Sequence, residues 1–448
     1  MNKQLRPYQL EDINFLSQRS RAACFNAPRT GKTPTALKTF ERQGHNKILI
    51  ICPASAVFQW ADEYEYWLNK PCVPINGTPK QKQELINNWT HGLSVSYDSF
   101  KSTSKSPGLI EPILKHNPQA VILDEAHRIK NTKTAAAKAA FQCRKIPYRL
   151  ALTGTPTTNK QHEIFSILAW LYPETFSSYW KFIDFYFGFE MKDSPEGHSY
   201  PVISPLKPTR KMYLIKTLNN ISTQRSRKEV MPWLPDKDYQ QIRLPCTKEQ
   251  LHYLNTLHEY YEVEHIICQG DLDRLVRYRQ ICLDPKLLDL KSKSPKTEWI
   301  KQYLKDYPNT PTLIFSKFTS FLKLLAKELK APLFIGETSS QERNQLINDF
   351  QNNKIKTLLI NIDAGREAIT LDTAETVIFT DKYPPAGHIE QAEDRFISTD
   401  QSKAEKPHTI IELMMKDTYD EELYKQVKAR LSETDIINNY QNYIIERS

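Results

Sequence analysis

The sequence predicts an α/β protein built from two doubly wound parallel-sheet domains. Short apolar runs, suited to strands buried on both faces, recur in both halves of the chain, and helical patterns separate them. The predicted strands are 22–25, 47–52, 93–100, 120–123 and 149–152, then 312–315, 333–335, 356–360, 376–380 and 408–413. The aromatic-rich stretch from residue 176 interrupts the alternation. We therefore expect a first domain over 1–170, a helical insertion and linker over 171–292, and a second domain over 293–448.

Length, charge and cysteine content restrict the number of domains, the kind of partner and the cellular compartment that we expect. The chain has 448 residues, enough for two or three domains, and a formal charge of +9 that suits a polyanionic partner without proving one. Its seven cysteines are odd in number and never spaced as CxxC, which favours reduced core thiols over disulfides or zinc. The polar start and the absence of a long apolar run predict a cytoplasmic protein that is neither secreted nor membrane-bound.

Two carboxylates follow the apolar run of residues 120–123. In VILDEAHRIKN, Asp124 and Glu125 stand where a parallel strand ends, which is the edge where α/β sheets hold ligands. An Asp-Glu pair after an apolar run is usually a solvated loop. A phosphate-loop pattern about ninety residues upstream changes that interpretation, because the two together are typical of a nucleotide triphosphatase. Asp124 is then expected to hold Mg²⁺, and Glu125 to polarise the attacking water.

The phosphate-loop pattern covers residues 26–33, which read NAPRTGKT. Backbone N–H groups of the Arg29-Thr30-Gly31 turn are expected to cradle the phosphates. Lys32 is expected to reach the β and γ phosphates, and the Thr33 hydroxyl to contact Mg²⁺. The usual pattern begins with glycine, whereas Asn26 stands at that position here.

The motif DEAH followed by RIKN, together with LTGTP at 152–156, resembles the SWI/SNF-like branch of the superfamily-two helicases and translocases. The resemblance runs from Leu5 to about Leu431. At this compact length the chain looks most like bacteriophage and bacterial members, including phage branch-migration DNA helicases. The resemblance implies two RecA-like domains, ATP and Mg²⁺ as cofactors, DNA as the partner, a monomeric motor and, for a phage protein, the host cytoplasm.

Several residue roles are implied by this resemblance alone. Gln9 is expected to read adenine, with Arg6 or Tyr8 flanking the base. Gln391 and Arg395 are expected to face the nucleotide from the second domain. The DNA contacts implied are Ser55, Lys130, Thr155, Lys317 and Thr370, with Thr153 and Thr155 bridging the nucleotide and DNA sites.

The sequence departs from the family pattern at two places. A second arginine usually follows three residues after Arg395, and Ser398 stands there. The preceding motif usually reads AGGxGLNL, and here Arg366 occupies one of its glycine positions. We hypothesise that Arg366 supplies the charge that Ser398 lacks. The alternatives are a DNA-phosphate contact or an ion pair of Arg366 with Glu367 or Asp363.

The combined expectation is an ATP-dependent DNA helicase or translocase that unwinds or branch-migrates forked and junction DNA. Residues 186–208 are a candidate strand-separating wedge or junction clamp, although a plain surface loop fits the same composition. The alternatives are a duplex translocase that remodels protein–DNA complexes, an RNA helicase, and a non-hydrolysing DNA-binding scaffold.

Overall fold

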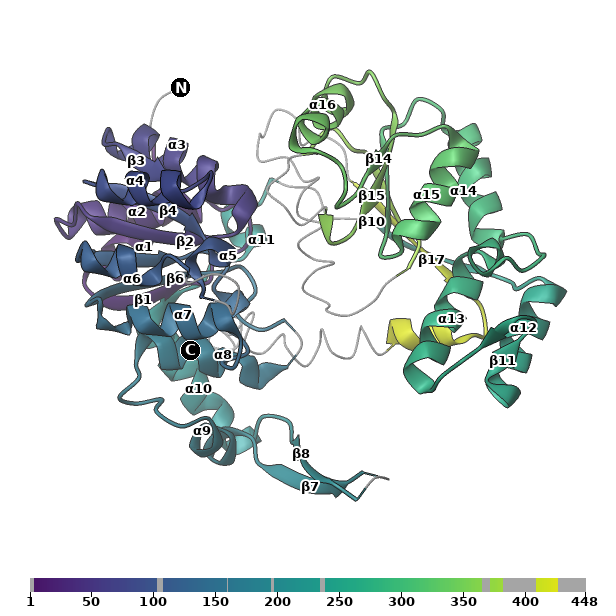
Figure 1. The fold of residues 1–448 in the computed structure, drawn as a ribbon, viewed down its shortest axis with the longest axis horizontal. Helices are drawn as coiled ribbons and strands as arrows, with labels where there is room; N and C mark the ends of the chain where they lie inside the picture. Colours follow the sequence, from purple (N-terminus) through teal and green to yellow (C-terminus); the bar gives the residue numbers. More distant parts are fainter. Residues whose placement is uncertain are drawn as a thin grey trace. The chain divides into compact units, whose positions relative to one another are not determined.

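The computed structural model describes residues 4–102, 108–158, 160–194, 197–233, 238–364, 371–381 and 408–425 (Figure 1). The chain divides into two compact units, and the boundary in the middle of the chain lies between Pro232 and Trp233. Residues 171–292, expected to form a separate insertion, are instead shared between these units.

The first unit is built on a seven-stranded parallel sheet. Its order is β3-β4-β2-β5-β6-β1-β9, so the chain starts near one edge at β1, crosses over to β2, and then places β3 and β4 on one side of β2 and β5 and β6 on the other. The strands are β1 (Arg21–Cys24), β2 (Ile48–Cys52), β3 (Cys72–Pro74), β4 (Gly92–Ser96), β5 (Ala120–Leu123), β6 (Tyr148–Leu152) and β9 (Ser222–Thr223). The predicted strand at 93–100 ends earlier because Ser96 caps the short helix α5 (Tyr97–Phe100), accepting from Ser99 N.

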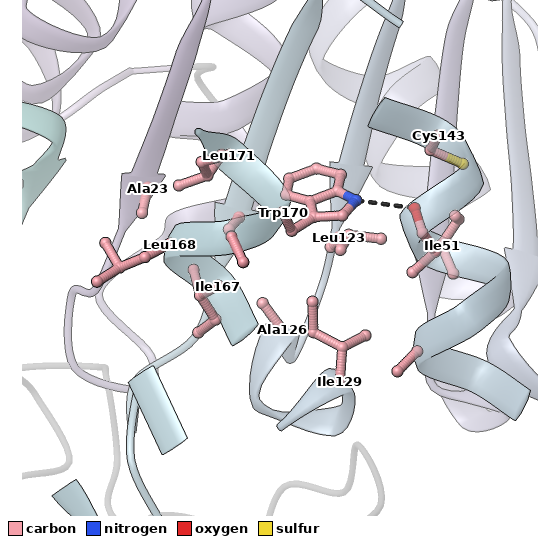
Figure 2. Close-up of a cluster of buried hydrophobic side chains, with 14 of the residues drawn as sticks. Ala23, Ile51, Leu123, Ala126, Ile129, Cys143, Ile167, Leu168, Trp170 and Leu171 are labelled. Atoms are coloured by element: carbon pink, nitrogen blue, oxygen red, sulfur yellow. Dashed lines mark hydrogen bonds between the residues drawn. The ribbon is translucent and has the colours of Figure 1, made fainter. Parts of the chain in front are cut away.

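Apolar residues on both faces of the strands give this sheet two cores. Ile48 and Ile50 pack with α1 (Pro7–Ser17), α2 (Lys32–Arg42) and α3 (Val57–Leu68), whereas Leu49 and Ile51 face the opposite core. That second core contains α7 (Ala135–Gln142) and α8 (Ile164–Leu171). Figure 2 shows it around the fully buried Trp170, whose indole N–H donates to the Ala140 carbonyl at 2.8 Å.

The stretch after α8, which the sequence predicted to be a helical insertion with a loop at 186–208, contains both helices and a β-hairpin. Helix α9 (Tyr179–Tyr186) leads into an antiparallel hairpin of β7 (Phe189–Asp193) and β8 (Ser199–Ile203), followed by α10 (Pro208–Ile221) and α11 (Arg227–Val230). The candidate loop at 186–208 is therefore largely this hairpin, which extends beyond α9 in Figure 1.

The second unit is a six-stranded parallel sheet in the order β10-β17-β16-β13-β15-β14. The strands are β10 (Asp238–Leu244), β13 (Thr312–Ser316), β14 (Leu333–Phe334), β15 (Thr357–Asn361), β16 (Thr376–Phe379) and β17 (Thr409–Met415). Helices α14 (Pro295–Asp306) and α15 (Thr319–Leu329) contribute to its core, and α16 (Ser340–Gln351) precedes β15. Helices α12 (Lys248–Tyr260) and α13 (Asp271–Leu283) form a smaller core with β11 (Glu262–Val263) and β12 (Ile266–Ile267). Two doubly wound parallel sheets confirm the predicted fold class.

Within the described ranges, helices long and apolar enough to cross a membrane are absent. Six of the seven cysteine side chains are buried and Cys246 is half-buried, which confirms the prediction of core thiols.

Candidate functional site

The phosphate loop connects β1 to the start of α2. Arg29 and Gly31 have positive φ angles of 65° and 79°, so the chain turns sharply before Lys32 begins the helix. A Cβ atom on Gly31 would lie 2.1 Å from Gln9 Nε2, so a larger residue here would displace the Gln9 amide from the loop. The Lys32 ammonium donates to the carbonyls of Asn26, at 3.0 Å, and Ala27, at 3.3 Å. The loop thus turns sharply into α2, with its lysine held against the loop backbone.

Helix α1 lies against this loop through its first turn. Gln9 Nε2 lies 3.2 Å from the Thr30 carbonyl and 3.3 Å from the Gly31 carbonyl, and Gln9 Oε1 accepts from Arg6 N at 2.8 Å. The Tyr8 hydroxyl donates to the Thr30 carbonyl at 2.7 Å. The residues expected to surround adenine are thus beside the phosphate loop, where a nucleotide must pass.

The carboxylate of Asp124 follows β5 directly and is held from two sides. Trp60 Nε1 donates to Oδ2 at 2.8 Å, and Glu125 N donates to Oδ1 at 3.0 Å. Burial and the neighbouring charge of Glu125 raise the pKa of Asp124 to about 6, while the Trp60 hydrogen bond and the Lys32 charge oppose the rise. Lys32 and Asp124 are therefore close enough for their charges to interact.

Glu125 is connected to the LTGTP loop through His127. Glu125 has φ 48° and ψ 52°, a left-handed conformation that turns the chain immediately after the strand. His127 Nδ1 lies 3.3 Å from Glu125 Oε2 and 3.1 Å from Thr153 Oγ1. A Cβ atom on Gly154 would lie 2.7 Å from Pro28 Cδ, so this loop packs on the phosphate loop. Buried Ala126 and Ile129 anchor the segment in the core of Figure 2.

The residues predicted to contact DNA in the first unit have different surroundings. Ser55 is exposed in the turn Ala54–Ala56. Lys130 Nζ donates to Thr158 Oγ1 at 2.5 Å and lies 3.6 Å from Glu163 Oε1. Thr155 is 5% exposed, and its N–H donates to Thr153 Oγ1 at 3.2 Å. Ser55 alone of these three is openly accessible.

In the second unit, the buried carboxylate of Asp381 accepts hydrogen bonds at the end of the sheet where the parallel strands have their carboxyl ends. Its Oδ1 accepts from Ser316 Oγ at 2.6 Å and from Lys317 N at 3.1 Å, and Arg279 Nη2 lies 3.2 Å from Oδ2. The Lys317 ammonium forms an ion pair with Asp363. The other predicted residues of this unit, Arg366, Thr370, Gln391 and Arg395, lie outside the described residues, as does Ser398.

These groups fit Mg²⁺ and a nucleotide triphosphate. The glycine cradle at Gly31 and the ammonium of Lys32 suit phosphates, and the carboxylate of Asp124 suits the metal. Clusters of three or more metal-ligating side chains are absent from the described part of the chain. Magnesium does not need such a cluster when phosphates and water complete its coordination.

Sequence reasoning did not identify Trp60 or Asp381 as part of a site, and it gave His127 no role. Trp60 stands 64 residues before Asp124, and no local sequence pattern links the two. Asp381 lies two residues beyond the apolar strand 376–379, and that position was the available signal.

Comparison with known families agrees with this geometry. The SNF2-related domain matches residues 11–287, more than half of the chain, and the helicase conserved C-terminal domain matches residues 295–399. The human DNA annealing helicase and endonuclease ZRANB3 is 24% identical over 434 residues, which cover 92% of this chain and 38% of that protein. The SWI/SNF-related matrix-associated actin-dependent regulator of chromatin subfamily A-like protein 1 of Xenopus tropicalis is 25% identical over 450 residues, covering 96% and 44%.

The chain thus spans about two fifths of the length of the curated relatives it matches. The solved SWI2/SNF2 ATPase core of Sulfolobus solfataricus in complex with dsDNA has 22% identity and a TM-score of 0.42, covering 99% of this chain and 95% of that one. The matched domains, the two parallel sheets and the phosphate-loop site together place the chain in the SNF2-related family of helicase-like ATPases.

Proposed function

We propose that the chain is an ATP-dependent DNA motor that unwinds or branch-migrates forked and junction DNA. The family match and the phosphate-loop site support ATP hydrolysis. The relatives that match nearly the whole chain include a DNA annealing helicase, which supports DNA as the partner. We favour branched DNA as the substrate because of the exposed hairpin β7–β8.

The hydrolytic roles follow from the first unit. Lys32 moves from the Asn26 and Ala27 carbonyls to the β and γ phosphates, because a phosphate oxygen is a charged acceptor and a carbonyl is not. Glu125 orients the attacking water and accepts its proton. Bound magnesium neutralises charge on the phosphate oxygens. Asp124 supplies the protein carboxylate on the metal side.

The hairpin presents an apolar face to solvent. Phe189 lies opposite Ile203 and Met191 opposite Pro201, so these four side chains share one face of the two-stranded ribbon. Phe189 is 43% exposed and Met191 57% exposed. The ring of Trp180, itself 47% exposed, lies 5.3 Å from that of Phe189 and extends the same surface.

The base of this hairpin is firmly held. Phe182, Ile183 and Phe187 are buried in the core of the first unit, and Lys207 N donates to the Tyr186 carbonyl at 2.9 Å. A rigidly mounted, exposed aromatic and aliphatic face suits unpaired bases, which stack on aromatic rings whatever their sequence. Intact duplex offers no free base faces. A fork or junction does, and we therefore favour branched DNA over plain duplex as the substrate.

Binding itself is expected to be electrostatic. A motor must grip any sequence, and phosphate contacts carry no sequence information. Contacts to about five phosphates predict a log–log salt slope of about −4 on duplex. An affinity insensitive to salt, or one abolished by changing a single base pair, contradicts this part of the proposal.

The hairpin is tested with two matched double variants. Phe189→Ser with Met191→Ser removes the apolar face, whereas Glu190→Ser with Lys192→Ser alters the opposite face of the same strand. We expect the first to lose at least about tenfold in strand displacement on forks with its DNA-stimulated ATPase retained. The second variant is expected to keep both activities. Equal loss of both activities in the first variant shows a structural role for the hairpin and defeats its assignment as a wedge.

A further inference from the structure

The first residue of the phosphate loop, Asn26, is held by its side chain. Glycine is usual at this position, but Asn26 is fully buried and its Nδ2 donates to Asp12 Oδ2 at 2.6 Å. Asp12 lies on α1 and is 1% exposed. A buried carboxylate is unfavourable unless its oxygens accept hydrogen bonds, so this contact strongly fixes both partners.

The second oxygen of the same carboxylate is bound by Arg225. Arg225 Nε donates to Asp12 Oδ1 at 3.1 Å, and its two terminal nitrogens reach Glu11 and Glu229, both at 2.8 Å. The backbone follows the same path, since Ala27 N donates to the Arg225 carbonyl at 2.9 Å. Asp12 thus joins the start of the phosphate loop to a segment about 200 residues later in the chain.

The same residue also sets where the catalytic lysine rests. Lys32 Nζ donates to the main-chain carbonyl of Asn26 at 3.0 Å, while the Asn26 side chain is held by Asp12. Any shift of Asn26 therefore moves the carbonyl that holds Lys32. The Asn26 Oδ1 atom has no hydrogen-bond partner among the described residues, so the single bond to Asp12 is what orients this amide.

We infer that Asp12, Asn26 and Arg225 form a positioning relay that fixes the phosphate loop and the resting place of Lys32, and thereby sets the affinity for nucleotide. This inference rests on the proposed ATP site but not on the choice of DNA substrate. None of the three side chains needs to touch the nucleotide. They act on it through the loop backbone and through Lys32, so loss of the relay weakens nucleotide binding while the chemical step of bound nucleotide continues.

An exchange of the two partners tests the relay. Asn26→Asp brings two carboxylates to hydrogen-bond distance, and Asp12→Asn replaces the carboxylate that Arg225 binds. Each single change should raise the Kd of a fluorescent ATP analogue at least about tenfold in the absence of DNA, with turnover at saturating ATP within about threefold of native. The double variant Asp12→Asn with Asn26→Asp again pairs an amide with a carboxylate but leaves Arg225 with a neutral acceptor, so it should bind more tightly than the weaker single variant without reaching native affinity.

Two further variants separate positioning from folding. Arg225→Lys keeps the charge but loses the planar fork, and it should also weaken binding. Glu229→Gln removes only an exposed partner of Arg225 and should bind as native does. Thermal denaturation of each variant reports whether it is folded.

Native affinity in both single variants overturns the inference. So does an exchange variant that binds no better than the weaker single variant, or a fall in saturated turnover with unchanged affinity. Failure of the native chain to bind the analogue at all instead refutes the proposed ATP site. Failure to unwind forked DNA, with these affinities as expected, refutes the proposed substrate and leaves the relay standing.

Discussion

The indole N–H of Trp60 donates a hydrogen bond to Asp124 Oδ2 at a distance of 2.8 Å. Trp60 lies on α3, which follows strand β2, and β2 is the direct neighbour of the strand that carries Asp124. Trp60 is 3% exposed, so packing around its indole holds the donor in place beside the half-buried Asp124. The carboxylate that we propose holds Mg²⁺ is therefore oriented by a side chain outside the proposed metal and phosphate contacts.

The raised pKa of Asp124 predicts an acid limit on metal-dependent nucleotide binding. Asp124 carries its charge above its pKa of about 6, so binding that requires Mg²⁺ should weaken as the pH falls through that value. Bound Mg²⁺ favours the charged form, so more Mg²⁺ should move the midpoint to lower pH. Trp60→Phe removes a donor to the charged form and should move the midpoint up by about one pH unit. Fluorescent-nucleotide titrations at several pH values measure this.

A second tryptophan provides the control for that experiment. Trp67 Nε1 donates to Glu63 Oε2 at 2.8 Å on the same helix, with the same chemistry but without contact to Asp124. Trp67→Phe should leave the pH midpoint unchanged. A midpoint that ignores Mg²⁺, or that moves equally in both variants, would show that Asp124 does not control it.

Glu125 and Lys32 should fail in different ways when replaced. Glu125→Gln keeps the shape of the side chain but removes the base, so hydrolysis should fall about 10²- to 10⁴-fold with nucleotide binding nearly intact. Lys32→Ala deletes a charge on the phosphates and should weaken both binding and turnover. Single-turnover hydrolysis and equilibrium binding distinguish the two. Near-native hydrolysis by the Glu125 variant would falsify its assignment as the water-activating residue.

Removing one partner of a buried ion pair should strongly lower the free energy of unfolding of the second unit. Lys296 is fully buried, and its ammonium donates to Asp420 Oδ2 at 2.5 Å and to the Thr380 carbonyl at 2.7 Å. Lys296→Met leaves the Asp420 carboxylate without its cation, and we expect a loss of about 3–5 kcal/mol in the free energy of unfolding. Hydrogen exchange of β17 amides follows this unit separately from the first.

An exposed ion pair in the same unit is the matched control. Lys286 Nζ lies 2.9 Å from Glu328 Oε1, but half of the lysine side chain is accessible to solvent. Lys286→Met should therefore cost less than about 1 kcal/mol. Similar losses in the two lysine variants would mean that burial does not set the strength of the Lys296 pair.

The hypothesis that Arg366 supplies the charge that Ser398 lacks stays a prediction. An arginine acting on the γ-phosphate contributes about 10³–10⁵ in rate, equivalent to about 4–7 kcal/mol. Arg366→Ala should slow turnover at least about a hundredfold with DNA affinity little changed. Weak DNA binding with normal turnover at saturating DNA would identify Arg366 as a DNA contact and leave Arg395 as the sole arginine finger.

Local sequence patterns were sufficient where burial is strong. Strands such as β2, with five consecutive buried residues, can be recognised from their apolar sequence because both faces of a buried parallel sheet must be apolar. The phosphate loop and the carboxylate pair were recognisable because chemistry constrains neighbouring residues. Strand β10 was not found, since it is an exposed edge strand with the polar sequence DYQQIRL and pairs with β17 about 170 residues later.

The missed features share a dependence on distant partners. The hairpin was read as a loop because glycine and proline lie in and around its strands, and because the alternation of Phe189 and Met191 with charged residues is too short to mark a strand. In sequence, Asp12 is one polar residue of an amphipathic helix pattern. Its structural role depends on its hydrogen bonds with Asn26 and Arg225. Such groups become visible when the fold brings them together.

Because the native cysteines are buried or half-buried, they should react only slowly with thiol-labelling reagents. Burial raises the pKa of Cys24 to about 11 and that of Cys143 to about 12, and even half-buried Cys246 has a pKa of about 11 for the same reason. Thiol reagents attack the thiolate, which is scarce at neutral pH for such groups. A cysteine introduced at exposed Lys192 would then accept a spectroscopic probe selectively, and the hairpin can be followed in an otherwise native chain while the motor turns over.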